Sequence, residues 1–214
     1  MKKISGGALI TKILIQNGIN KAFCVPGESY LGVLEAIRES KNKFDLVVCR
    51  HEGGAAYMAE AYGRLTQMPG ICFVTRGPGA CNASIGVHTA YHEGTPLILF
   101  VGQVPVKSLK KNAFQSIDTD KFFNSMAKYT ETIKDPKNIR KILEKAIYLS
   151  TEGKPGPVVL GIPEDIQFAM VSDKISEVLE NKTHKIKSKI FRAYIKAVSY
   201  THLRAHETRE DLVC

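Results

Sequence analysis

The sequence predicts an α/β protein with a doubly wound, mainly parallel six-stranded sheet that carries helices on both faces. Three observations lead to this prediction. Apolar runs of strand length recur along the chain, the runs are continuous rather than alternating, and helical patterns separate them. Continuous apolar runs are typical of parallel strands that are covered on both faces, and strand–helix alternation is typical of an open sheet.

Five apolar runs predict fully buried strands, and a weaker run at residues 129–133 predicts a sixth. A helix precedes the first of them, beginning at about Ser5 and ending at Gly18, because glycine commonly terminates a helix. The five runs are residues 21–25, 45–49, 71–75, 97–101 and 157–161.

Another helix is predicted to begin at Asp135-Pro136, because aspartate is a favourable N-cap and proline suits the first helical position. Residues 103–120 form a long polar connection, and connections of this length in compact domains are often functional. The apolar residues of the helix keep the spacing of one buried face: Ile139, Ile142, Leu143, Ala146 and Ile147.

Composition restricts the class of protein. Hydrophobic residues make up 44% of the chain, charged residues 24%, and no apolar run approaches the roughly 20 residues that cross a bilayer. No signal peptide is recognisable, and the five cysteines fit neither a zinc site nor a disulfide framework. We therefore expect a cytoplasmic protein with no membrane partner.

The net charge of +9 is concentrated near the end of the chain. Residues 182–196 hold six basic residues and no acidic ones, which indicates a solvated linker. Phe191 and Tyr194 stand alone near its end and do not alternate with the basic residues as a series of stacking platforms for bases would, so we expect no nucleic-acid partner.

The strand–helix pattern fades after about Ile166. We expect residues 1–168 to form one domain, residues 169–192 to form a linker, and residues 193–214 to be a foreign or disordered tail. His202 and His206 could share a metal on a helix, but no third ligand accompanies them, so no metal site is predicted.

The chemically unusual residues follow the predicted strands. Ligands of open α/β sheets bind beyond the carboxyl ends of the strands. Together these segments predict a binding site at one edge of the sheet. Glycine, proline and acidic residues gather in the segments that occupy those positions: residues 26–28, 51–54, 76–79, 102–103 and 162–165.

A dinucleotide site and a purely structural role for Glu52 are two simpler interpretations of the residues at this edge. The segment GPGACN (residues 77–82) fails the dinucleotide fingerprint, because Asn82 fills the third glycine position and no acidic residue follows about 20 residues later. Glu52 could serve only the dipole of the helix that it begins. The glycines and alanines after Glu52, however, leave room for a flat ligand to approach the backbone.

Four segments resemble the pyrimidine-binding (Pyr) domain of thiamine diphosphate enzymes, in the branch of the acetolactate synthases and pyruvate oxidases. They are RHEGGAAYMAEAYGR, TRGPGACNASIGVHTAYHEGTPLILFVGQV, NAFQSID and GKPGPVVLGIPEDIQ, and the resemblance covers about residues 1–168. It implies that Glu52 is catalytic and hydrogen-bonds N1′ of the aminopyrimidine. That bond promotes the imino tautomer, whose nitrogen removes the thiazolium C2 proton before attack on a 2-oxo acid.

The resemblance also implies the remaining site residues. Phe114 and Gln115 match the Phe-Gln pair at the active site of acetolactate synthases, which favours pyruvate as substrate. His88 and His92 are expected to serve packing. The expected cofactor-binding residues are Pro26, Gly27, Glu52, Thr75, Pro78, Gly79 and Asn82.

Other parts of a complete family member are expected outside this sequence. The diphosphate and Mg²⁺ are held through a GDG motif of a diphosphate-binding (PP) domain, and no GDG occurs here. FAD, a property of the middle domain, is left open. We therefore expect an N-terminal part of an acetolactate synthase-like catalytic subunit that is inactive alone.

The resemblance further implies a homodimer or homotetramer through the Pyr domain, which meets the PP domain of a partner subunit. The small residues after Glu52 would pack at that dimer interface. Two alternatives stay open. One is a stand-alone Pyr subunit that pairs with a separate PP subunit, and the other is a nucleotide-binding or purely structural α/β module.

Overall fold

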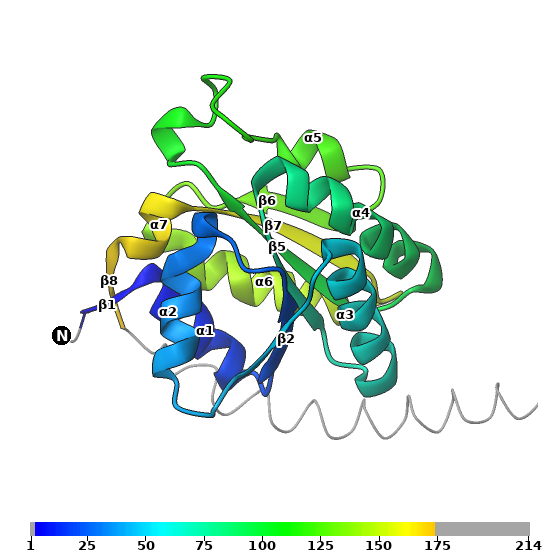
Figure 1. Ribbon diagram of the computed structural model, residues 1–214. Coiled ribbons are helices and arrows are strands. Elements are labelled where there is room, and N and C mark those ends of the chain that lie inside the picture. Colours follow the sequence, from blue (N-terminus) through cyan, green and yellow to red (C-terminus); the bar gives the residue numbers. More distant parts are fainter. Residues whose placement is uncertain (1–2, 174–214) are drawn as a thin grey trace, which may run out of the picture. The chain divides into compact units, whose positions relative to one another are not determined.

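Six parallel strands form the main sheet of the computed structural model, which describes residues 3–173 (Figure 1). Their order across the sheet is β3-β2-β4-β5-β7-β6, and every neighbouring pair is parallel. The predicted six-stranded α/β sheet is thus confirmed. The strands are β2 (Lys21–Cys24), β3 (Asp45–Val48), β4 (Gly70–Thr75), β5 (Leu97–Gln103), β6 (Tyr129–Thr132) and β7 (Pro157–Pro163).

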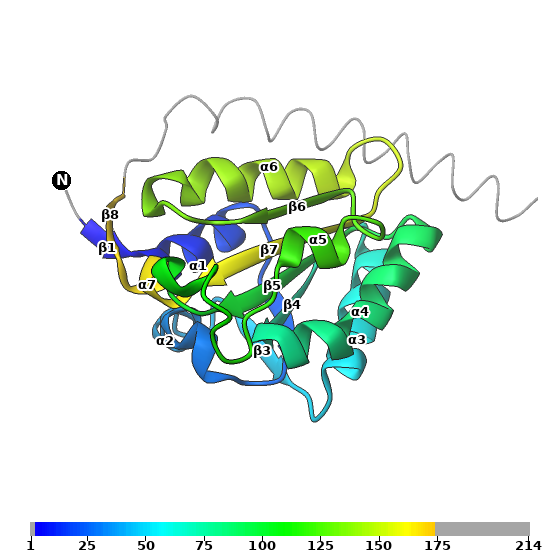
Figure 2. The ribbon, with the colours of Figure 1, turned by 90° about the horizontal axis from the view of Figure 1, so that it is seen from above.

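Helices cover both faces of this sheet, as predicted (Figures 1 and 2). One core forms between the sheet and α1, α2 and α6, and a second forms between the sheet and α3 and α4. Among the described residues, no helix is both long and apolar enough to cross a membrane. The helices are α1 (Gly6–Gln16), α2 (Leu31–Glu39), α3 (Glu52–Thr66), α4 (Arg76–Glu93), α5 (Thr119–Phe123), α6 (Ile139–Thr151) and α7 (Glu164–Phe168).

The predicted helix ends follow from local chemistry. Ser5 caps α1 by accepting a hydrogen bond from the backbone N–H of Ala8, and Gly18 adopts the left-handed φ of +76° just after the helix. Asp135 caps a short 3-10 turn, η3 (Pro136–Asn138), which leads directly into α6. Two further 3-10 turns are η1 (Glu28–Tyr30) and η2 (Val106–Ser108).

The order of the strands fixes where a ligand can bind. β2 lies in the sheet between β3, which follows it in the chain, and β4, which comes later. The chain therefore reverses its direction of travel across the sheet at β2. In doubly wound sheets such a switch point opens a crevice beyond the carboxyl ends of the strands.

Small residues let α3 and α4 pack very closely. A Cβ added to Gly86 of α4 would lie 2.5 Å from the Cβ of Ala56 in α3. Gly70 of β4 likewise lies close to α3, since a Cβ added there would lie 1.8 Å from the carbonyl oxygen of Ala59. Ala55, Ala56 and Ala59 are fully buried within the chain. These alanines therefore pack within the chain, and the dimer interface expected from the resemblance stays a prediction.

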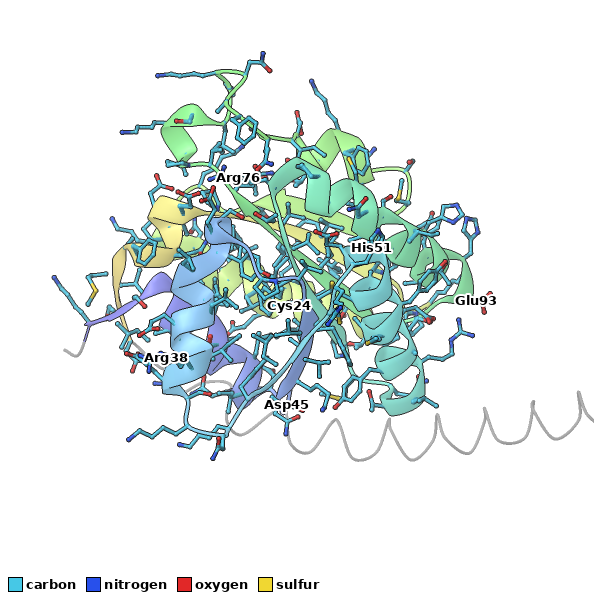
Figure 3. The ribbon with its side chains drawn as sticks, in the orientation of Figure 1. Cys24, Arg38, Asp45, His51, Arg76 and Glu93 are labelled. Carbon is cyan, nitrogen blue, oxygen red and sulfur yellow. The ribbon has the colours of Figure 1, made fainter. Side chains whose placement is uncertain are left out.

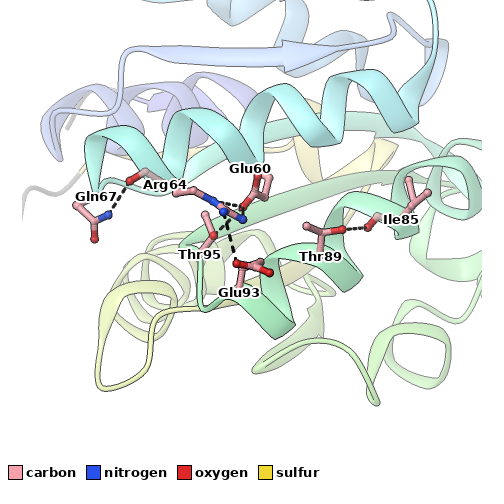
Figure 4. Close-up of polar contacts among 7 residues, drawn as sticks. All are labelled: Glu60, Arg64, Gln67, Ile85, Thr89, Glu93 and Thr95. Atoms are coloured by element: carbon pink, nitrogen blue, oxygen red, sulfur yellow. Dashed lines mark hydrogen bonds and ion pairs between the residues drawn. The ribbon is translucent and has the colours of Figure 1, made fainter. Parts of the chain in front are cut away.

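A buried carboxylate joins α3 to the end of α4 (Figure 4). Glu60 is 5% exposed, and its Oε1 accepts hydrogen bonds from Arg64 Nη2 at 2.7 Å and from Thr95 Oγ1 at 2.8 Å. Arg64 also lies 3.4 Å from Glu93 Oε2. These contacts satisfy a charge that would be costly to bury alone.

Two features differ from the sequence predictions. The run at residues 45–49 was expected to be fully buried, which is wrong, because β3 is an edge strand and Val48 is 63% exposed. A second, two-stranded sheet was not predicted, in which β1 (Lys3–Ser5) pairs antiparallel with β8 (Met170–Ser172).

The compact unit consequently runs through Asp173, beyond the boundary expected at residue 168. The expected tail at residues 193–214, together with His202 and His206, lies outside the described residues. The expected linker at residues 169–192 lies outside them beyond Asp173.

Candidate functional site

Glu52 and Asn82 meet at the carboxyl edge of the sheet. Glu52 is the first residue of α3, which follows β3, and Asn82 lies in α4, which follows β4. Asn82 Nδ2 donates a hydrogen bond of 2.9 Å to Glu52 Oε2. Two of the residues implied by the resemblance thus form one polar pair, although they lie on different helices.

The start of α3 is built so that Glu52 is held at this edge. His51 caps the helix, because its Nδ1 accepts a hydrogen bond of 3.0 Å from the backbone N–H of Gly53. The Glu52 carboxylate, which is half-buried, also lies in the first turn, where the helix dipole stabilises negative charge. The structural and the catalytic interpretations of Glu52 are therefore compatible.

Gly79 leaves space beside the second oxygen of the same carboxylate. A Cβ added at Gly79 would lie 3.6 Å from Glu52 Oε1 and 3.1 Å from the Cβ of Val74. A side chain here would press on Val74 and contact Oε1. Whereas Oε2 is bonded to Asn82, Oε1 forms no hydrogen bond within residues 3–173, so a ligand nitrogen could donate to it.

The turn after β2 packs against the end of β4. Ser29 Oγ and Thr75 Oγ1 lie 2.7 Å apart and share a hydrogen bond. A Cβ on Gly27 would lie 2.6 Å from the Cβ of Thr75, and a Cβ on Gly102 would lie 2.2 Å from Ser29 Oγ. Gly27 and Thr75 are thus brought together, whereas Ser29 was missed by the sequence analysis.

Arg76 connects three of these turns, a role that the sequence analysis did not assign. Its Nη2 lies 2.6 Å from Glu164 Oε1, after β7, and its Nη1 lies 3.3 Å from Glu28 Oε1, after β2. Arg76 has a φ of +41°, which is costly for a residue other than glycine. In Figure 3 Arg76 lies in the upper half of the view, below the segment that follows β5, whereas Asp45, at the start of β3, lies near the bottom.

Gln115 approaches the glycine-rich start of α4, whereas Phe114 points away from the core. The backbone carbonyl of Gln115 accepts a hydrogen bond of 2.8 Å from the N–H of Gly77. Phe114 is 78% exposed. Buried Gln103 anchors the same connection, donating from Nε2 to the carbonyl of Ile117 at 2.9 Å.

Four other predicted residues are exposed. Pro26 and Pro78 lie in the turns after β2 and β4, on the same edge as Glu52. His88 and His92 were expected to serve packing, but both are exposed on α4, so they do not pack into the core. The centroids of their rings lie 4.5 Å apart, so the two rings contact each other instead.

Two buried thiols and a buried tyrosine on or beside the strands of the sheet are poor candidates for acid–base chemistry. Burial raises the pKa of Cys24 to about 11 and raises the pKa of Cys72 well above its ordinary value. Burial also raises the pKa of Tyr30, whose hydroxyl donates to the carbonyl of Val25. All three groups are neutral at pH 7, so the half-buried Glu52 carboxylate is the better candidate.

The family whose description is "Thiamine pyrophosphate enzyme, N-terminal TPP binding domain" matches residues 4–122. The chain belongs to this family. Thiamine pyrophosphate is another name for thiamine diphosphate, so the resemblance noted from the sequence is confirmed. The residues described above fit an aminopyrimidine, since Glu52 Oε1, which has no hydrogen-bond partner among the described residues, lies beside Gly79 and can pair with a ring nitrogen.

Named relatives are acetolactate synthases. The isozyme 3 large subunit of Escherichia coli is 36% identical over 166 residues, which cover 78% of this chain and 29% of that protein. The large subunit of Lactococcus lactis is 36% identical over 172 residues, or 80% of this chain and 30% of that protein. The mitochondrial acetolactate synthase of Schizosaccharomyces pombe is 31% identical over 201 residues, or 88% of this chain.

The chain spans about 30% of the length of these relatives. Within residues 3–173, no group of three or more His, Cys, Asp or Glu side chains is arranged to hold a metal ion.

Proposed function

We propose that this chain is the pyrimidine-binding part of an acetolactate synthase-like catalytic subunit and that Glu52 exchanges a proton with the bound ring. The observation that carries the proposal is the Glu52 carboxylate, whose Oε2 accepts a hydrogen bond from Asn82 and whose Oε1, beside Gly79, forms none within residues 3–173. Family membership and the acetolactate synthase relatives support it.

The chain contributes binding and orientation before it contributes proton transfer. Gly27 and Gly79 let the turns after β2 and β4 pack closely on Thr75 and Val74, which sets the shape of the edge where a flat ring would lie. The hydrogen bond from Asn82 favours the rotation of the Glu52 carboxylate that leaves the other oxygen for the ring nitrogen. When bound, thiamine diphosphate supplies the electron sink for decarboxylation of a 2-oxo acid, pyruvate being favoured by Phe114 and Gln115.

The remaining requirements would be met outside the described unit. Mg²⁺ and the diphosphate would be held by the PP domain of a partner subunit, in a homodimer or homotetramer, and FAD would belong to a middle domain. Exposed Phe114 is available for contact with such a partner. We place the protein in the cytoplasm, and we assign residues 1–168, within the compact unit that runs through Asp173, to the Pyr domain.

The test begins with the source gene, read through and beyond the codon for Cys214. The longest continuous product is then purified and assayed for acetolactate formation from pyruvate, with thiamine diphosphate and Mg²⁺ added. Glu52→Gln keeps a hydrogen-bonding amide but cannot exchange a proton. It should therefore lower turnover by roughly 10²–10⁴-fold, the usual contribution of general acid–base catalysis.

The matched control is Glu35→Gln, which changes a surface carboxylate on α2 that is 54% exposed and should leave turnover unchanged. Unfolding by urea should show that Glu52→Gln alters the free energy of unfolding by less than about 1 kcal/mol. Full activity in Glu52→Gln would overturn the assignment of Glu52. A reading frame that ends at Cys214 would instead favour a stand-alone Pyr subunit, and the assay would then include a separate PP subunit.

A further inference from the structure

A pocket of about 250 Å³ lies beside the connection that follows β5. Two elements form it. One is the segment around η2, and the other is the turn that follows β6, on the far side of β7 in the sheet. In Figure 1 the segment after β5 rises above the carboxyl edge of the sheet. The residues that line the pocket are Val106, Lys107, Leu109, Lys110, Lys111 and Lys134.

The charges of this pocket are all of one sign. Four of its six lining residues are lysines, and none of the six is acidic. Within the part of the chain that the structure describes, none of these four lysines forms an ion pair, whereas Lys12 and Lys121 each pair with an aspartate. Like charges that share a pocket repel one another, so a bound anion would stabilise them.

Two carboxylates beside lining residues of the pocket accept hydrogen bonds from the backbone. Asp165 accepts hydrogen bonds from the N–H of Val106 at 3.1 and 3.2 Å and from that of Ile166 at 3.1 Å. Asp135, next to Lys134 in the sequence, accepts from the N–H of Lys137 at 2.9 Å. These carboxylates stabilise the backbone on both sides of the pocket and do not line it.

The backbone that carries the lysines is itself hydrogen-bonded. The N–H of Ser108 donates to the carbonyl of Pro105 at 2.7 Å, and the N–H of Lys111 donates to the carbonyl of Ser108 at 3.1 Å. Lys134 follows Ile133, which is fully buried. The lysines therefore extend from backbone that is already folded, and little ordering of the chain would be needed on binding.

We propose that this lysine pocket binds the diphosphate or triphosphate group of a small molecule. At pH 7 a diphosphate ester carries a charge of about −3 and a triphosphate ester about −4, so either offsets most or all of the charge of four ammonium groups. Lysine binds phosphate as a flexible point charge. Val106 and Leu109 add apolar surface on which an organic part of the ligand can lie.

The experiment measures binding of inorganic pyrophosphate to the purified 214-residue chain by isothermal titration calorimetry, with EDTA present and at low salt. No carboxylate lines the pocket to hold a cation, so binding should need no Mg²⁺. The triple variant Lys107→Gln/Lys110→Gln/Lys111→Gln should weaken binding by at least about tenfold, with the loss shrinking as salt rises. Lys134→Gln, on a different element, should weaken it by a smaller factor.

The matched control is Lys41→Gln/Lys43→Gln/Lys141→Gln, which removes the same charge from exposed lysines elsewhere. It should bind pyrophosphate as the unaltered chain does. All the changed lysines are exposed, so urea unfolding should give the same free energy for every variant. Tighter binding of ADP than of pyrophosphate would further support contact of an organic part with Val106 and Leu109.

Three results would overturn the proposal: no binding at millimolar pyrophosphate, binding only with Mg²⁺, or equal weakening by the pocket variant and the control. The last result would mean nonspecific attraction to a basic chain. The outcome does not depend on thiamine diphosphate, so it is separate from the test of Glu52.

Discussion

The side-chain amide of Asn82 donates a 2.9 Å hydrogen bond to Oε2 of Glu52, and so joins α4 to the first residue of α3. The bond links the glycine-rich segment after β4 to the carboxylate after β3. The residue that would exchange a proton is thereby held by the segment that would line the ring.

Replacing Asn82 with alanine should lower turnover of the complete protein by about tenfold, which corresponds to about 1.4 kcal/mol of activation free energy. The carboxylate would remain but would no longer be held in one orientation. Steady-state kinetics should show a fall in kcat with little change in the KM for pyruvate. Asn138→Ala, at an exposed position with no side-chain bond to the helix it precedes, is the control. Unchanged kcat in Asn82→Ala would contradict the orienting role.

Glu60→Ala should destabilise the chain by roughly 1–3 kcal/mol, because it removes the acceptor of Thr95 and Arg64 from a buried site. Urea unfolding monitored by circular dichroism measures the change. Glu35→Ala removes a surface carboxylate paired with Arg38 and should cost no more than about 1 kcal/mol. Equal losses in the two variants would show that the cluster around Glu60 contributes no more than a surface pair.

Two glycine-to-alanine changes on the paired helices should have opposite signs. Gly86→Ala would place a Cβ 2.5 Å from Ala56 and should cost about 1–3 kcal/mol through overpacking. Gly54→Ala on α3 meets no atom within 4 Å and should stabilise the helix by about 0.5–1 kcal/mol. The midpoints of urea unfolding curves compare them, and a stable Gly86→Ala would mean that the two helices can separate at little cost.

The free energy of unfolding should fall as the pH rises from about 9 to about 11. Burial raises the pKa of Cys24 from its ordinary value of 9.0 to about 11, so the unfolded chain loses this proton first. The stability that the protonated Cys24 thiol contributes is complete below pH 9 and is lost as the pH rises through 11. Cys24→Ala should show a shallower fall than the unaltered chain in urea titrations across this range.

Cys81→Ala, which removes an exposed thiol, provides the matched control for this titration. Its unfolding free energy should fall as steeply with pH as that of the unaltered chain. A fall that is equally steep in Cys24→Ala would show that other groups, and not this thiol, carry the dependence.

The strands of the main sheet could be predicted because a buried parallel strand appears in the sequence as an unbroken apolar run. At residues 45–49 the same pattern led to the wrong prediction of a fully buried strand. An apolar run shows that a strand is apolar, but only its neighbours decide whether it is central, and β3 has a neighbour on one side only. β1 and β8 have only three residues each, which is too short for a periodic pattern. They also stand at opposite ends of the unit's sequence, so no local pattern shows that they pair.

The meeting of Glu52 and Asn82 was predictable because the carboxyl ends of parallel strands share one edge. The contact between Ser29 and Thr75 was not, since these residues are 46 positions apart and meet only because β4 lies beside β2. The same holds for Arg76, whose two carboxylate partners follow β2 and β7. Such contacts depend on strand order, which no local pattern encodes.

The pairing of β1 with β8 places the beginning of the compact unit beside its end (Figure 1). A unit whose two ends emerge side by side can be inserted into a loop of another protein, or cut open elsewhere and rejoined at its old ends, without stretching either chain. The two ends of the Pyr unit therefore lie side by side. Because of this arrangement, recombination could move the unit between genes as a single block.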